Sequence, residues 1–146
     1  MAETPLWTCP RCGRRFTRPG QSHSCGAFSV PDHLRGKTPY AVALYRGFEQ
    51  LALAVGDVVV APARTRIGFQ RRRIFAAVNR IAAEHIDVHI VTAGPIDSPR
   101  VRRIDALASD CYVNHLRIAS VQELDAELSA WLKQGYTWGG ADLNRA

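Results

Sequence analysis

Three of the four cysteines lie within residues 7–26, a segment with almost no aliphatic side chains. Cys9 and Cys12 have the C-x-x-C spacing at which a tight turn presents two thiolates to one metal ion. His23 and Cys25 alternate along a segment that we expect to be extended, so their side chains point to the same side. Zinc binds four sulfur and nitrogen ligands tetrahedrally. These four side chains therefore predict a structural Zn²⁺ in a small zinc knuckle, with no open position for a substrate.

Two features of the knuckle bear on its ligand set and its role. Ten residues separate Cys12 from His23, fewer than the about twelve of a regular finger, so His33 stays an alternative to His23. Proline and glycine interrupt the segment between Phe16 and His23, which excludes a recognition helix that enters a DNA groove. A redox dithiol would require a preceding strand and a following helix, and we reject it. The knuckle is thus expected to be a clip or a docking surface.

The basic residues are mostly arginines and are unevenly distributed. The net charge is +6, and residues 61–103 contain nine Arg or Lys against three Asp or Glu, whereas residues 104–146 contain three against six. Arginine binds phosphate and carboxylate groups in a bidentate fork, and basic proteins commonly bind nucleic acid. GC-rich coding bias also produces arginine-rich proteins, so composition leaves both explanations open. Four further arginines in the knuckle either offset its thiolate charge or contact nucleic acid.

The stretch 65–73 is the best candidate for a second site, because its arginines would gather at the ends of adjacent strands. Gly68 within it allows a ligand or another backbone to approach closely. We predict a groove for an anion or nucleic acid, completed by the last strand; the alternative is a solvated basic hairpin. The predicted groove residues are Arg66, Gln70, Arg72, Arg73, His115 and Arg117.

No residue is predicted to be catalytic. The chain contains no nucleophile elbow, no phosphate-binding glycine loop and no paired-carboxylate nuclease motif. His85, His89 and His115 are spread over separate strands with no partner that the sequence identifies, and such histidines are usually surface or hydrogen-bonded residues. Asp105 and Asp110 have no lysine or histidine at a telling distance along the chain.

Hydrophobic periodicity predicts a helix, a series of short strands and a second helix. Thr38-Pro39 starts the first helix, over 39–55, and Ser120 begins a capping box for the last helix, which Gly135 ends. Short connections favour an antiparallel meander. The fold class is therefore α+β, with N-terminal and C-terminal helices on one face of the sheet and the knuckle preceding it. The expected strands are 57–61, 66–69, 73–78, 86–91, 101–107 and 111–118.

The sequence predicts no membrane-spanning segment and no signal peptide. No apolar run reaches the about 18–20 residues that would span a bilayer, and the N-terminus lacks the basic and apolar parts of a signal peptide. We therefore expect a cytoplasmic protein without membrane contact, whose cysteines stay reduced.

The chain is expected to divide into five segments. They are a tail over 1–6, the zinc knuckle over 7–26, a linker over 27–37, the α+β domain over 38–136 and a disordered tail over 137–146.

Several motifs occur together along the chain. They are WTCPxCGxxF from Trp7, QSHSCG from Gln21, DHLxGK from Asp32, TRIGFQ from Thr65, IFAAV from Ile74 and NHxRxxSxxELD from Asn114. In combination they resemble an uncharacterised bacterial family, the domain of unknown function numbered 5655. The resemblance implies a cysteine-histidine knuckle before a small α+β domain, and it implies no activity. Relatives of its α+β part occur beside restriction and other nucleic-acid-handling domains, which favours nucleic acid by association.

Three functions are compatible with these patterns. The first is a non-enzymatic, zinc-containing module that binds an anionic partner such as nucleic acid through an arginine-rich face. The second is a protein–protein adaptor that docks a partner through the knuckle. The third is a small enzyme for an anionic substrate, which would use Arg66, Arg73 and His115 in a deep pocket.

Overall fold

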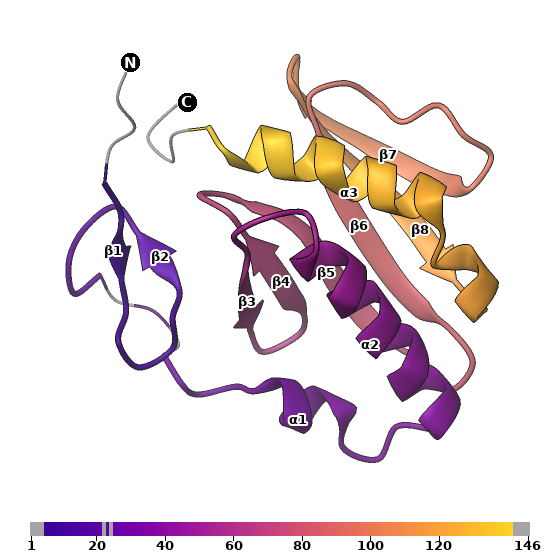
Figure 1. Ribbon diagram of the computed structural model, residues 1–146, viewed down its shortest axis with the longest axis horizontal. Helices are drawn as coiled ribbons and strands as arrows, with labels where there is room; N and C mark the ends of the chain where they lie inside the picture. Colours follow the sequence, from indigo (N-terminus) through magenta and orange to yellow (C-terminus); the bar gives the residue numbers. More distant parts are fainter. Residues whose placement is uncertain (1–4, 22, 24, 142–146) are drawn as a thin grey trace.

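The computed structural model of the protein describes residues 5–21, 23 and 25–141. A small two-stranded unit lies beside a six-stranded sheet with two long helices (Figure 1). Of the two predicted tails, residues 1–4 and 142–146 lie outside the described part. No helix in the described part is long and apolar enough to cross a bilayer. The small unit contains β1 (Trp7–Thr8) and β2 (Arg15–Phe16), and a short helix α1 (Val30–Leu34) follows it.

The large sheet is entirely antiparallel and confirms the α+β class. Its strands are β3 (Val59–Pro62), β4 (Ile67–Gln70), β5 (Ile74–Ile81), β6 (Ile86–Thr92), β7 (Val101–Ala108) and β8 (Cys111–Ile118). The first four strands follow one another as a meander, but the spatial order is β3-β4-β5-β6-β8-β7. The chain therefore crosses to the outer edge after β6, and β8 fills the gap. Asn114 fixes this crossing, because its buried Oδ1 accepts a hydrogen bond from Ile96 N at 3.0 Å.

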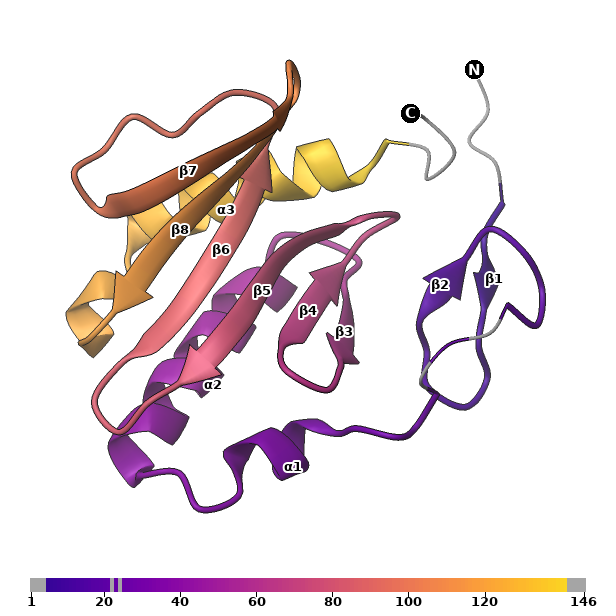
Figure 2. The same cartoon turned by 180° about the vertical axis from the view of Figure 1, so that it is seen from behind.

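Both long helices, α2 (Pro39–Leu53) and α3 (Ala126–Gly139), cover the same face of the sheet (Figures 1 and 2). The predicted start of α2 is confirmed, because Thr38 Oγ1 accepts a hydrogen bond from Ala41 N at 3.1 Å and Pro39 occupies the first turn. Phe48 of α2 packs edge-to-face on Phe69 of β4, with ring centroids 5.7 Å apart. The hydrophobic core thus lies between the helices and one face of the sheet.

No helix among the described residues covers the other face of the sheet, and Figure 2 shows this face in front. Along β6, Ile86, Val88 and Ile90 are buried in the core. Asp87 and His89 alternate with them and line the open face instead. Because side chains alternate along a strand, polar residues at every second position mark a sheet with one buried and one open face.

The last helix departs from the sequence prediction at both ends. Ser120 does form a capping box with Glu123, but it caps only a 3₁₀ turn (Val121–Glu123), which Leu124 ends by leaving helical geometry. The helix proper begins at Ala126, where Asp125 Oδ1 accepts a hydrogen bond from Leu128 N at 3.0 Å. A second capping residue five positions after the first was therefore the decisive one.

The prediction that Gly135 ends the last helix is wrong, since α3 continues to Gly139. Gly135 is buried inside the helix and faces β5 and β6. A Cβ on it would lie 2.9 Å from Ile90 Cγ2 and 3.2 Å from the Val91 carbonyl oxygen. Glycine is therefore required here for close packing of helix on sheet, and the first residues of the predicted tail are helical.

Candidate functional site

The four predicted metal ligands converge in the small two-stranded unit. Cys9 Sγ lies 3.4 Å from Cys25 Sγ, and Cys12 Sγ lies 3.3 Å from His23 Nε2. All four ligand atoms lie within 4.8 Å of one another. A tetrahedral Zn²⁺ with Zn–S bonds of about 2.3 Å places its ligand atoms about 3.5–3.8 Å apart. The donor set and its dimensions thus fit a metal ion.

The turn after Cys9 is built to hold a thiolate. Gly13 N donates to the Cys9 carbonyl at 2.8 Å, and Gly13 has a φ of +76°, which favours glycine. Burial raises the pKa of the Cys9 thiol, but the backbone N–H groups of Arg11 and Cys12 outweigh it and lower that pKa to about 6. The Cys25 thiol hydrogen-bonds to Cys9, which raises the pKa of Cys25 to about 11. A bound metal ion would displace the proton that the two sulfurs share.

His23 presents the correct nitrogen to the cluster. Its Nδ1 lies 2.6 Å from the Gln21 carbonyl oxygen, so Nδ1 carries the proton and Nε2 keeps its lone pair. This arrangement of a ligand imidazole is usual in metal sites. The ring also packs against Phe16 at a centroid distance of 4.3 Å. His33, the alternative ligand, is instead directed at the Ala63 carbonyl oxygen at 2.6 Å.

Arg15 joins the knuckle to the α+β domain. Its backbone N–H donates to Gln70 Oε1 at 3.1 Å, and Gln70 Nε2 donates back to the Arg15 carbonyl at 2.9 Å. The Arg15 guanidinium donates to the Arg71 carbonyl at 2.8 Å and forms an ion pair with the exposed Asp57. Gln70 is buried, so its amide is committed to this contact.

The turn 71–73 caps the C-terminal end of α3. The backbone N–H groups of Arg72 and Arg73 donate to the Gly139 carbonyl at 3.0 and 2.9 Å. The Arg73 guanidinium donates to the Trp138 carbonyl at 2.6 Å and lies 3.5 Å from the centroid of the Trp138 ring. Cations near a helix C-terminus are stabilised by its partial negative charge. Gln70 and the Arg73 side chain thus make structural contacts, and neither these two residues nor Arg72 lines the groove that contains the other three predicted groove residues.

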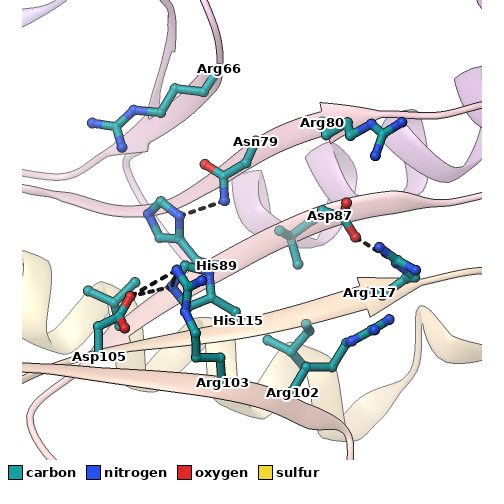
Figure 3. Close-up of a pocket in the computed structure, with 13 residues that line it drawn as sticks. Arg66, Asn79, Arg80, Asp87, His89, Arg102, Arg103, Asp105, His115 and Arg117 are labelled. Atoms are coloured by element: carbon teal, nitrogen blue, oxygen red, sulfur yellow. Dashed lines mark hydrogen bonds and ion pairs between the residues drawn. The ribbon is translucent and has the colours of Figure 1, made fainter.

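Arg66, His115 and Arg117 do come together on the open face of the sheet. They line a groove of about 640 Å³ that crosses β5, β6, β8 and β7 (Figure 3). Its floor contains His89 and its rim carries five exposed arginines against two aspartates. No Phe, Tyr or Trp is among the residues that line it. The polar lining residues are Arg66, Asn79, Arg80, Asp87, His89, Arg102, Arg103, Asp105, His115 and Arg117.

Both aspartates of the groove are already paired. Arg117 Nε donates to Asp87 Oδ1 at 2.8 Å, and Arg103 Nη2 lies 3.1 Å from Asp105 Oδ2. The remaining three groove arginines, Arg66, Arg80 and Arg102, have no carboxylate within ion-pair distance among the residues that the structure describes. The groove therefore presents uncompensated positive charge.

Two histidines lie side by side in the groove, because His89 of β6 and His115 of β8 are opposite each other in the strand register. Their ring centroids are 5.8 Å apart. His89 Nδ1 accepts a hydrogen bond from Asn79 Nδ2 at 2.9 Å, and His115 Nε2 lies 2.9 Å from Asp105 Oδ2. Burial, with a further contribution from the positive charge of Arg66, lowers the pKa of His89 to about 4. His89 is thus a neutral imidazole whose Nε2 carries the proton.

Sequence reasoning missed seven of the ten polar residues that line this groove. The interpretation that Asp105 has no histidine at a telling distance is wrong, because the β7–β8 hairpin sets Arg103 opposite His115 and brings Asp105 diagonally across. Pairing the two predicted strands as a hairpin would have found this contact. Hydrogen bonding to His115, together with Arg103, lowers the pKa of Asp105, so it is a carboxylate. The missed polar residues are Asn79, Arg80, Asp87, His89, Arg102, Arg103 and Asp105.

The fold and the two sites define an α+β domain with an open, basic sheet face and a Cys₃His cluster before it. Residues 30–138 match the family described as a domain of unknown function, DUF5655, and the chain belongs to that family. The match begins at α1 and leaves out the knuckle. No curated protein and no solved structure matches the chain.

Proposed function

We propose that this protein is a binding module for nucleic acid, which its arginine-rich sheet face contacts through the phosphates. The observation that carries the proposal is a cluster of three exposed arginines in one groove that pair with no carboxylate of the described residues: Arg66, Arg80 and Arg102. Arginine recognises phosphate oxygens in a bidentate fork and is weakly hydrated. The charge excess of this face is therefore local to a concave surface and is not spread evenly over the chain.

The lining of the groove favours contact with the phosphate backbone over contact with bases. Single-stranded nucleic acid is usually held on a sheet by aromatic side chains that stack on successive bases. The lining residues include no Phe, Tyr or Trp. Phosphate contacts fix position without sequence information. We therefore expect binding with little base-sequence preference.

The knuckle serves as a structural clip in this proposal, and its ion is Zn²⁺. Three thiolates and one imidazole are soft or borderline ligands, which suit zinc and leave no coordination position open. The clip is fastened by Arg15, which contacts Gln70, the Arg71 carbonyl and Asp57. These contacts explain why Gln70 is buried at the end of β4. The metal centre thus stabilises the structure of the protein and does not contribute to ligand binding in the groove.

Fluorescence anisotropy with labelled 12-nucleotide DNA and RNA, single-stranded and duplex, tests the proposal at low salt. We expect the triple variant R66Q/R80Q/R102Q to bind at least about tenfold more weakly than the parent protein. The matched control is Arg46→Gln, because Arg46 is an exposed arginine on α2, which covers the opposite face. Absence of binding to every probe, or equal affinity of the triple variant, would contradict the proposal.

A further inference from the structure

The inner end of the groove differs from its rim. His89 retains only 7% of its exposure, whereas Arg66 and Arg103 nearby are exposed. In Figure 3, Arg66, His89, His115, Arg103 and Asp105 lie at one end of the groove, and the Asp87–Arg117 pair lies at the other. A ligand must therefore extend a small group below the rim to reach the imidazole of His89.

Hydrogen-bond donors surround this recess. His89 accepts at Nδ1 from Asn79, so its Nε2–H is free to donate, and the neutral ring adds no charge. His115 lines the recess with a second imidazole, whose Nε2 donates to Asp105 Oδ2 at 2.9 Å and so helps to offset that carboxylate rather than supplying a free donor. Arg66 and Arg103 contribute two guanidinium groups. Among the described lining residues, Asp105 is the one carboxylate at this end, and its pairs with His115 and Arg103 offset its charge.

From this arrangement we infer a subsite for a phosphomonoester dianion, the group found at a phosphorylated nucleic-acid end or on a nucleoside monophosphate. A terminal phosphate protrudes from the chain and carries about two negative charges, with three oxygens that each accept hydrogen bonds. A phosphodiester in the backbone carries one charge and is flanked by sugars on both sides. The recess therefore fits a chain end better than the middle of a strand.

The inference rests on the proposed function and adds which part of the nucleic acid the recess recognises. The arginines of the rim hold the phosphate backbone, and the recess, which shares Arg66 with the rim, recognises where the backbone ends. Each charge-assisted hydrogen bond to a phosphate oxygen is strong because the donor or the acceptor is ionised. We expect a 5′-phosphorylated strand to bind about tenfold more tightly than the same strand with a 5′-hydroxyl.

The test compares three probes on the full-length protein at about 50 mM salt, where backbone contacts are strong. They are a 12-nucleotide DNA with a 5′-phosphate, the same DNA with a 5′-hydroxyl, and a nucleoside 5′-monophosphate. The quantity measured is the affinity ratio of the first two probes. This ratio isolates the end group, because a general loss of affinity changes both probes equally.

Two variants and one control locate the subsite. Arg66→Gln and His115→Asn should each reduce the affinity ratio toward one. His85→Asn should leave the ratio unchanged, because His85 is not among the residues that line the groove. Thermal unfolding of each variant verifies that it is folded, and Arg66→Gln is an exposed substitution that keeps the test valid if His115→Asn fails to fold. A ratio that persists in both variants would overturn the inference.

The outcomes separate this inference from the function on which it rests. Equal binding of the two DNAs overturns the subsite and leaves groove binding intact. Binding of the monophosphate without binding of either DNA supports the subsite and overturns the nucleic-acid proposal. Failure of all three probes to bind overturns both.

Discussion

The salt dependence of binding is the most quantitative consequence of the groove. Each arginine–phosphate contact on duplex DNA releases condensed counterions and contributes about −0.9 to the slope of log Kobs against log salt. Arg66, Arg80 and Arg102 have no carboxylate to exchange for a phosphate, whereas Arg103 and Arg117 are already paired. Three contacts predict a slope of about −2.7, so affinity should fall about 40-fold between 50 and 200 mM salt.

Single substitutions should subtract one contact each. Changing Arg66, Arg80 or Arg102 to glutamine is expected to reduce the slope to about −1.8, which corresponds to a loss of about 12-fold over the same salt range. The assay is fluorescence anisotropy with a labelled duplex whose ends carry hydroxyl groups, so that the end subsite does not contribute. Arg46→Gln should retain the parental slope.

A slope shallower than about −1 would refute this reasoning, because it would mean that at most one phosphate contact forms. Unchanged slopes in all three single variants would refute it equally. In that case the arginines of the groove would be solvated and the anion, if bound, would lie elsewhere on the molecule.

Three further outcomes follow from the structure. Cys12→Ser should reduce the metal content, measured by elemental analysis, from about one ion per chain to none. Cooperative unfolding of the sheet domain should persist, because its core contains no knuckle residue. Retained metal would contradict the proposed ligand set. His89 has a pKa of about 4 in the folded protein, against about 6.5 in the unfolded chain, so the folded state binds fewer protons between these pH values. The stability contributed by neutral His89 is on the order of 3 kcal/mol; it is complete above pH 6.5 and is lost as the pH falls to 4. Urea unfolding from pH 7.5 to 4.5 should show this loss, and His89→Asn should remove it; an NMR titration that places the pKa of His89 near 6.5 would refute it. Gly135→Ala should lower the free energy of unfolding by about 1–3 kcal/mol. The clash of the new Cβ with Ile90 at 2.9 Å outweighs the about 1 kcal/mol that alanine gains in helix propensity. A stabilised variant would show that the helix is free to shift.

Two groups of arginines in this chain have different surroundings, which composition could not distinguish. Those at 71–73 lie beside the C-terminal end of α3, where the backbone of the turn and the Arg73 side chain donate to its last carbonyl groups. Trp138 belongs to the same arrangement, since its ring stacks on Arg73 and its Nε1 donates to the Asp110 carbonyl at 3.0 Å. The second group lines the groove on the open face. Three members of the second group, Arg66, Arg80 and Arg102, are exposed and pair with no described carboxylate.

Local patterns were sufficient for much of this protein. The Cys/His cluster could be predicted because the spacing of its residues is short and the chemistry of Cys and His is specific. The helix start at Pro39 and the alternation along β6 depend on neighbouring residues alone, and the structure follows both. The antiparallel α+β class followed from short connections between strands. Each of these features is encoded within a few residues of where it appears.

Tertiary structure decided the rest, because it brings together residues that are far apart along the chain. The place of β8 between β6 and β7 sets His115 opposite His89 and assembles the groove. The end of α3 depends on how closely Gly135 approaches the sheet, which no local pattern contains. The order of the strands and the distance between helix and sheet are those that minimise the free energy of the whole core. A short stretch of sequence therefore cannot predict them.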